Sequence, residues 1–172
     1  MKKSPTLLLC FFLLSCLSLN LHSQPLQNEL DQVKLAQQLI GTWEAKTGED
    51  SIMLWTVTPA FGKGLIQKLE WKANGKVFNE AVSVLGFSDD SRTIFMTWVW
   101  FGGDMTIDVG RFVSEKKLVM ERIRQSSPMH AVALEEMDFS TPNMCMYTHS
   151  QRGRNITWEP VWEFSPQFTK ID

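Results

Sequence analysis

Residues 65–86 read LIQKLEWKANGKVFNEAVSVLG, and their pattern decides the fold class. In the first half of the stretch, apolar side chains that end with Trp71 alternate with polar and charged ones. This period of two is typical of a β-strand with one dry face and one wet face. Asn74 and Gly75 interrupt the alternation, and both residues tolerate the positive φ angles of a type I′ turn. Because a second alternating run follows, the stretch predicts an antiparallel β-hairpin.

The same period of two continues on both sides of this hairpin. Short runs with strand character are separated by turn sequences rich in Gly, Pro, Asn, Asp and Ser. Strands are expected near residues 42–47, 51–58, 65–73, 76–86, 92–101, 104–113, 117–124, 129–139, 144–150 and 155–164. The fold class is therefore all-β, an antiparallel up-and-down β-barrel of about ten strands, since closure removes the exposed edges of so long a meander.

One segment before the strands departs from this period. Residues 26–40, LQNELDQVKLAQQLI, place Leu26, Leu30 and Val33 at helical spacing among polar residues. Gly41 follows, where a helix commonly ends. The pattern predicts one amphipathic N-terminal helix that lies against or across one end of the barrel.

The first residues have the pattern of a targeting segment. A basic start at Lys2 and Lys3 is followed by an apolar run over 7–21, and small Ser23 precedes a polar stretch. We expect residues 1–23 to be a secretory signal peptide, which leaves residues 24–172 as the barrel domain. The run is shorter than the about 20 residues of a membrane span, so no transmembrane span is expected in the mature protein.

An alternative for this segment is a lipid anchor. Residues 13–16, LLSC, resemble a bacterial lipoprotein box, in which Cys16 would carry the lipid. Either way the sequence predicts an exported protein, periplasmic or extracellular in the first case and lipid-anchored in the cell envelope in the second.

Length and charge narrow the classes of function. The chain has 172 residues, with 17 Lys and Arg against 19 Asp and Glu, and 7 Trp against 1 Tyr. Without residues 1–23, which hold two lysines and no acid, the balance is 15 − 19 = −4. One domain with a substantial core fits this length. Binding to nucleic acid needs a clustered basic excess, so no nucleic-acid partner is expected.

Charged residues on otherwise apolar strand faces are informative exceptions. Arg122 shares its face with Met120, Glu135 shares its face with Met137, and Arg111 falls on an apolar face of residues 104–113. Three interpretations are open. A bulge or register slip turns these charges to solvent, or they form an internal ion pair, or they orient a ligand in an apolar pocket.

The strand at 93–101, TIFMTWVWF, is apolar on both faces. One face carries Ile94, Met96, Trp98 and Trp100, and the other carries Phe95, Thr97, Val99 and Phe101. We expect one face to line the barrel interior and the N-terminal helix to cover the other. If the second face is exposed instead, it marks an interface with a partner.

The residues typical of catalytic and metal sites are sparse. His130 and His149 have no further His, Cys or carboxylate pair at the spacing of metal ligands, so no metal site is expected. Cys145 and His149 are four residues apart, about 13 Å along a strand at ~3.3 Å per residue, too far for a nucleophile and its base. The sequence therefore predicts that the protein is not an enzyme.

Three segments carry a resemblance to a known family. Residues 39–44, LIGTWE, resemble the Gly-x-Trp entry into the first strand of the lipocalin-like (calycin) barrels, and 84–90 and 144–164 are similar to later segments of small exported bacterial lipocalin-like proteins. The Thr-Asp-Tyr signature of lipocalins proper is missing. Haem-binding barrels of the nitrobindin type carry their ligating His in the final strand. Residues 155–164 contain no His, so no haem or other cofactor is expected.

The resemblance implies a barrel that binds a small hydrophobic ligand. The candidate ligand-binding residues combine tryptophans on one strand parity with a few polar contacts: Trp71, Trp98, Trp100, Met120, Arg122, Glu135 and Trp162. The alternative is an interaction or structural protein of the cell envelope, with a barrel that side chains fill. A monomer or a weak homodimer is expected.

Overall fold

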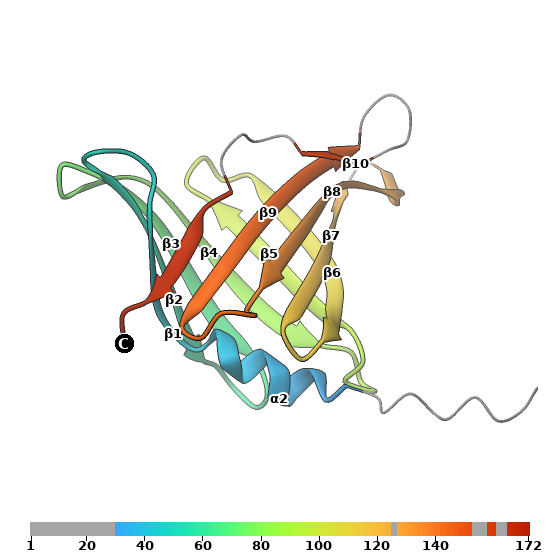
Figure 1. The fold of residues 1–172 in the computed structure, drawn as a ribbon. Coiled ribbons are helices and arrows are strands. Elements are labelled where there is room, and N and C mark those ends of the chain that lie inside the picture. Colours follow the sequence, from blue (N-terminus) through green and yellow to red (C-terminus); the bar gives the residue numbers. More distant parts are fainter. Residues whose placement is uncertain (1–29, 125–126, 153–157, 161–164) are drawn as a thin grey trace, which may run out of the picture.

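The computed structural model shows an antiparallel β-barrel closed by ten strands (Figure 1). The structure describes residues 30–124, 127–152, 158–160 and 165–172. Its elements are the helix α2 (Gln32–Ala36), the 3-10 turn η2 (Gln37–Leu39), and the strands β1 (Gly41–Lys46), β2 (Ser51–Pro59), β3 (Leu65–Ala73), β4 (Lys76–Phe87), β5 (Ile94–Trp100), β6 (Met105–Ser114), β7 (Lys117–Arg124), β8 (Ser127–Asp138), β9 (Met144–Arg152), β10 (Trp158–Pro160) and β11 (Gln167–Lys170).

Neighbours in sequence are neighbours in the sheet from β1 to β9, as the meander predicted. The barrel is closed by β11, which pairs with β9 on one side and with β1 on the other. The predicted last strand, 155–164, corresponds in the described residues to β10, which pairs with β9. Residues 155–157 and 161–164 lie outside the described part. The closing strand therefore lies after the last predicted strand, in residues for which no strand was expected.

The hairpin between β3 and β4 has the predicted turn. Asn74 and Gly75 have φ angles of 50° and 74°, as the type I′ turn requires. We call this end of the barrel the hairpin end. We call the opposite end, across which α2 and η2 lie in Figure 1, the helix end.

The helix is tied to the barrel by side-chain hydrogen bonds. The Asp31 carboxylate caps α2 by accepting from the Lys34 backbone N–H at 3.0 Å. The buried Gln32 amide accepts from the Phe112 N–H at 2.6 Å and donates to the Phe112 carbonyl at 3.2 Å. These two hydrogen bonds fasten α2 to the backbone of β6.

Two expectations about the helix need correction. The helical segment ends at Leu39, and Gly41, expected to cap it, is instead the first residue of β1 with φ of 132°. This positive φ strains any residue with a Cβ, so the backbone conformation favours glycine there. Of the predicted range 26–40, residues 26–29 lie outside the described part.

The second expectation, that the helix covers the outer face of β5, is wrong. Phe95 and Val99 are 43% and 50% exposed, because α2 lies across the helix end rather than along the wall. The exposed apolar face continues onto the neighbouring strands, where Val82 pairs with Val99 and Met105 pairs with Val99 from the other side. We call the surface formed by Ile66, Val82, Val84, Phe95, Val99 and Met105 the outer apolar face.

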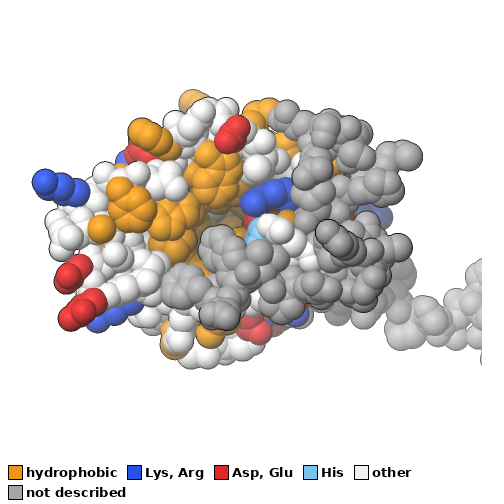
Figure 2. All heavy atoms as spheres, turned by 90° about the horizontal axis from the view of Figure 1, so that it is seen from above, with side chains coloured by type: hydrophobic (Ala, Val, Ile, Leu, Met, Phe, Trp, Pro, Cys, Tyr) orange, Lys and Arg blue, Asp and Glu red, His pale blue; other side chains and the backbone are white. Residues whose placement is uncertain are grey.

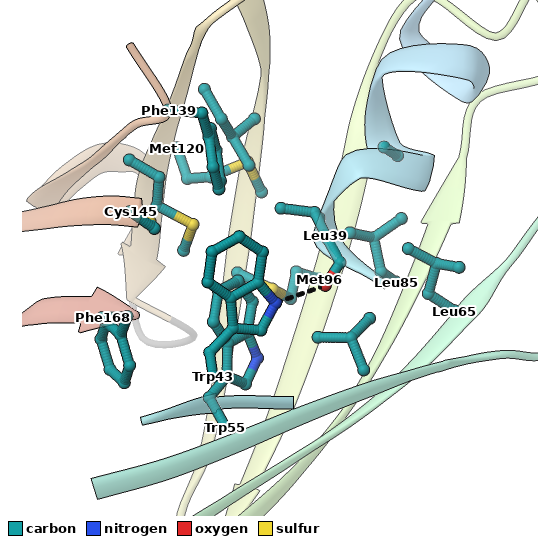
Figure 3. Packing of buried hydrophobic residues seen from close by; sticks show 14 of the residues in the cluster. Leu39, Trp43, Trp55, Leu65, Leu85, Met96, Met120, Phe139, Cys145 and Phe168 are labelled. Carbon is teal, nitrogen blue, oxygen red and sulfur yellow. Dashed lines mark hydrogen bonds between the residues drawn. The ribbon is translucent and has the colours of Figure 1, made fainter. Parts of the chain in front are cut away.

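Large side chains fill the interior at the helix end (Figure 3). The Trp43 indole N–H donates to the Leu39 carbonyl at 2.8 Å, and the Trp43 ring meets Phe139 edge to face at 6.0 Å. Phe112 is 1% exposed and packs on Phe139. This half of the barrel is a packed core.

None of the helices in the described residues has the length and apolar character needed to cross a membrane.

Candidate functional site

A cavity of about 80 Å³ opens inside the barrel toward the hairpin end. It is lined by Met53, Trp55, Leu69, Trp71, Trp98, Trp100, Arg122, Glu135, Met137, Cys145, Tyr147 and Phe168. Figure 2, which looks onto this end, shows hydrophobic side chains around a hollow, with basic and histidine side chains on its opposite side. The cavity thus has an aromatic wall and a polar wall.

The aromatic wall comes from inward-facing positions of β3 and β5. The ring centroids of Trp71 and Trp100 are 5.9 Å apart, and those of Trp98 and Trp100 are 6.0 Å apart. The Trp100 indole N–H donates to the Thr106 hydroxyl at 3.2 Å, which fixes the orientation of this half-buried ring. Since alternate residues of a strand point to one side, Trp98 and Trp100 reach the same cavity.

The polar wall crosses adjacent strands. Asp108 on β6 lies directly opposite Arg122 on β7, and the guanidinium donates to both carboxylate oxygens, from Nε at 2.9 Å and from Nη2 at 3.3 Å. The same Nη2 donates to Glu135 Oε1 on β8. Asp108 and Glu135 are 0% and 3% exposed, so the guanidinium holds together two carboxylates that water does not reach.

The strand β9 extends this wall. His149 lies directly opposite Glu135 in the register, and its Nδ1 is 3.5 Å from Glu135 Oε1. Tyr147 lines the cavity two residues away. Burial raises the pKa of the Tyr147 hydroxyl well above its ordinary value, and the charge of Glu135 raises it further. Tyr147 therefore remains a neutral phenol. We call Asp108, Arg122, Glu135, Tyr147 and His149 the ionic cluster.

Burial and charge act against each other in this cluster. Burial raises the pKa of Asp108 to about 6, and the neighbouring Glu135 carboxylate adds to the increase. Burial by itself would lower the pKa of Arg122, but Glu135 and Asp108 outweigh it and the pKa is raised. Arg122 therefore stays charged, while Asp108 changes its charge near pH 6.

The structure brings most of the candidate residues together. Trp71, Trp98, Trp100, Arg122 and Glu135 all line the cavity. Met120 is fully buried in the hydrophobic core and is not among the lining residues. The side chain of Trp162 lies outside the described residues.

The interpretation that a bulge turns the charges to solvent is wrong for Arg122 and Glu135, which point inward and form an internal ion pair. Arg111 is exposed, but the cause is not a bulge or register slip: the other parity of β6 faces the interior.

Asp108 is the residue that the sequence reasoning missed. It shares its inward parity with Gly110 and Phe112, and the more apolar series that contains Ile107 and Val109 was taken for the inner face instead. Gly110 is a signal that could have corrected this choice. A Cβ at Gly110 would lie 2.0 Å from the Val119 carbonyl oxygen, so β6 passes β7 too closely for any other residue.

The described residues contain no group of three or more His, Cys, Asp and Glu side chains placed to hold a metal ion.

Comparison of the chain with the models of known protein families found no match, and no curated protein matched it either. The fold and the cavity therefore define the class. The protein is an antiparallel β-barrel of ten strands, compatible with a lipocalin-like fold, with a cavity at the hairpin end.

Proposed function

We propose that the protein is an exported lipocalin-like barrel that binds a small, mostly apolar molecule in the cavity at the hairpin end. The observation that carries this proposal is the contrast within one cavity between the tryptophan wall and the buried ionic cluster. A few polar groups in an apolar concavity are typical of small-molecule sites, because the apolar wall supplies affinity and the polar groups fix orientation. A binding role, rather than an enzymatic one, fits a cluster whose carboxylates are already paired with Arg122.

Tryptophan fluorescence tests the proposal directly, since Trp71, Trp98 and Trp100 line the cavity. A panel of lipids, haem and aromatic metabolites is titrated into the protein, and we expect at least one compound to shift the emission with saturation. Leu69→Phe, which fills the cavity, should weaken that binding. The matched control is Ile66→Phe on the same strand, where the side chain points outward. A panel without any saturable shift would contradict the proposal.

Export is part of the same proposal and rests on residues 1–23. The N-terminus of the protein recovered from the cell envelope or medium should begin at Gln24. If the protein instead begins at a lipid-modified Cys16, it is anchored to the cell envelope by that lipid.

The outer apolar face supports a second candidate function, docking to a partner of the cell envelope. Its paired residues Val82 and Val99 are 45% and 50% exposed, in the middle of a wall that a monomer leaves open to water. Light scattering after size-exclusion chromatography separates the two functions. A monodisperse monomer disfavours docking, whereas an oligomer that Val99→Lys dissociates would support it.

A further inference from the structure

The charges around the cavity do not balance. Asp108 and Glu135 contribute two carboxylates, and Arg122 contributes one guanidinium. Tyr147 stays neutral. The two carboxylates and the guanidinium that they contact therefore have a net charge of 1 − 2 = −1.

The positive charge of the guanidinium is already shared by two carboxylates. Its Nε and Nη2 atoms already donate to Asp108 and Glu135. A carboxylate ligand would compete with both for the same cation and would add a third negative charge to a poorly solvated site. Electrostatic repulsion is stronger there than in water. The cluster therefore disfavours a fatty acid or another organic anion.

The opposite wall favours positive charge. The faces of indole rings are electron-rich and attract ammonium groups, and tryptophan is the most effective aromatic side chain for this contact. The ring centroid of Trp100 lies 5.9 Å from that of Trp71 and 6.0 Å from that of Trp98, and all three rings line the same cavity as Glu135.

We propose that the ligand of this cavity is a small organic cation, an amine whose apolar part lies among the tryptophans and whose ammonium group faces Glu135. This inference rests on the proposed binding function and names the chemical class of its ligand. The ammonium compensates the unbalanced carboxylate and donates hydrogen bonds to it, without displacing Arg122 from Asp108.

A matched series of probes tests the charge preference. Hexylamine, 1-hexanol and hexanoate have the same chain and differ in the charge of the head group, and hexylamine is cationic at pH 8. Their affinities are measured by tryptophan fluorescence and by calorimetry at pH 8. We expect hexylamine to bind about tenfold more tightly than 1-hexanol, and hexanoate to bind most weakly. If 1-hexanol or hexanoate binds at least as tightly as hexylamine, the inference is overturned while the binding function stands. If no probe and no panel compound binds, both are overturned.

Two variants identify the residues responsible. Glu135→Gln keeps the shape of the side chain and removes its charge, so hexylamine should lose about tenfold in affinity while 1-hexanol is unchanged. The control is Glu136→Gln on the same strand, whose carboxylate pairs with Lys117 at 2.6 Å on the outside. Trp71→Leu, at a half-buried ring, should also reduce the preference for hexylamine, and it serves as the test if Glu135→Gln fails to fold. A preference for hexylamine that both variants leave intact would overturn the assignment.

Discussion

The two halves of the barrel interior contain the same kind of side chain and use it differently. At the helix end, Trp43 is 3% exposed, donates a hydrogen bond to the Leu39 carbonyl and packs on Phe139. At the hairpin end, Trp71 and Trp100 are only half-buried and face a cavity. The difference comes from what lies opposite: a helix closes the first half, and an ionic cluster lines the second. Tryptophan on an inward parity therefore shows that a face is internal, but the neighbouring groups decide whether it fills a core or lines a cavity.

The largest expected effect separates the two tryptophan environments. Trp43→Ala removes a fully packed ring and should lower the free energy of unfolding by about 4 kcal/mol. Trp71→Ala removes a ring that is already partly hydrated and should lower it by about 2 kcal/mol or less. Urea denaturation followed by circular dichroism measures both. Equal losses would show that the hairpin end is packed as tightly as the helix end.

The ionic cluster gives the next effect. Arg122→Met leaves Asp108 and Glu135 buried without their cation, so the free energy of unfolding should fall by about 3 kcal/mol. Adding Asp108→Asn should restore part of the loss, because one of the stranded charges is gone. Arg111→Met, at an exposed position of β6, is the control and should change stability little. Additive losses in the double variant would contradict a coupled cluster.

Asp108 also makes stability depend on pH. In the folded protein its pKa is raised to about 6 from an ordinary value of 3.8, so the folded state binds more protons than the unfolded chain between these values. The free energy of unfolding should consequently fall as the pH rises from 4 to 6, by about 2 kcal/mol from this group. Asp108→Asn should remove that part of the slope, and Asp104→Asn, at an exposed carboxyl group, should keep it. If Asp108→Asn leaves the pH dependence of the free energy of unfolding unchanged, that dependence comes from other groups.

The smallest effect is expected on the outer apolar face, which contrasts with both interior halves. Val99→Thr conserves shape at a 50% exposed position and should change the free energy of unfolding by about 0.5 kcal/mol or less. Thermal denaturation checks this. A loss comparable to that of Trp71→Ala would show that this face is buried against a partner under the conditions of the measurement.

Local patterns predicted much of the fold. Alternation and turn chemistry placed the strands up to β9 closely, and the parity of Leu69 and Trp71 against Lys68 and Glu70 was right. The inward directions of Arg122 and Glu135 were also one of the predicted alternatives. These features could be predicted because each follows from a few consecutive residues.

The remaining features depend on residues far apart in the chain. The closing strand Gln167–Lys170 has four residues and a single buried side chain, Phe168, which is too short for an alternating pattern to be recognised. Its pairing with β1 and β9 brings together distant parts of the chain. The position of the helix depends on the contact between Gln32 and Phe112, 80 residues apart. Asp108 was missed because Gly110 is the sole local signal for its face, and the reason for that glycine is the close approach of β7.

The way the barrel closes also bears on how the chain folds. Trp43 pairs with Lys170, a separation of 170 − 43 = 127 residues, whereas hairpins such as β3–β4 join neighbours. Loop-closure entropy delays such distant contacts, so the meander should form first and the union of β1 with β11 last. Until then the edge of β1 is unpaired and can bind another chain. Shortening the chain before Gln167 would therefore leave an open sheet prone to association, and refolding should show a slow phase in which that association competes with closure.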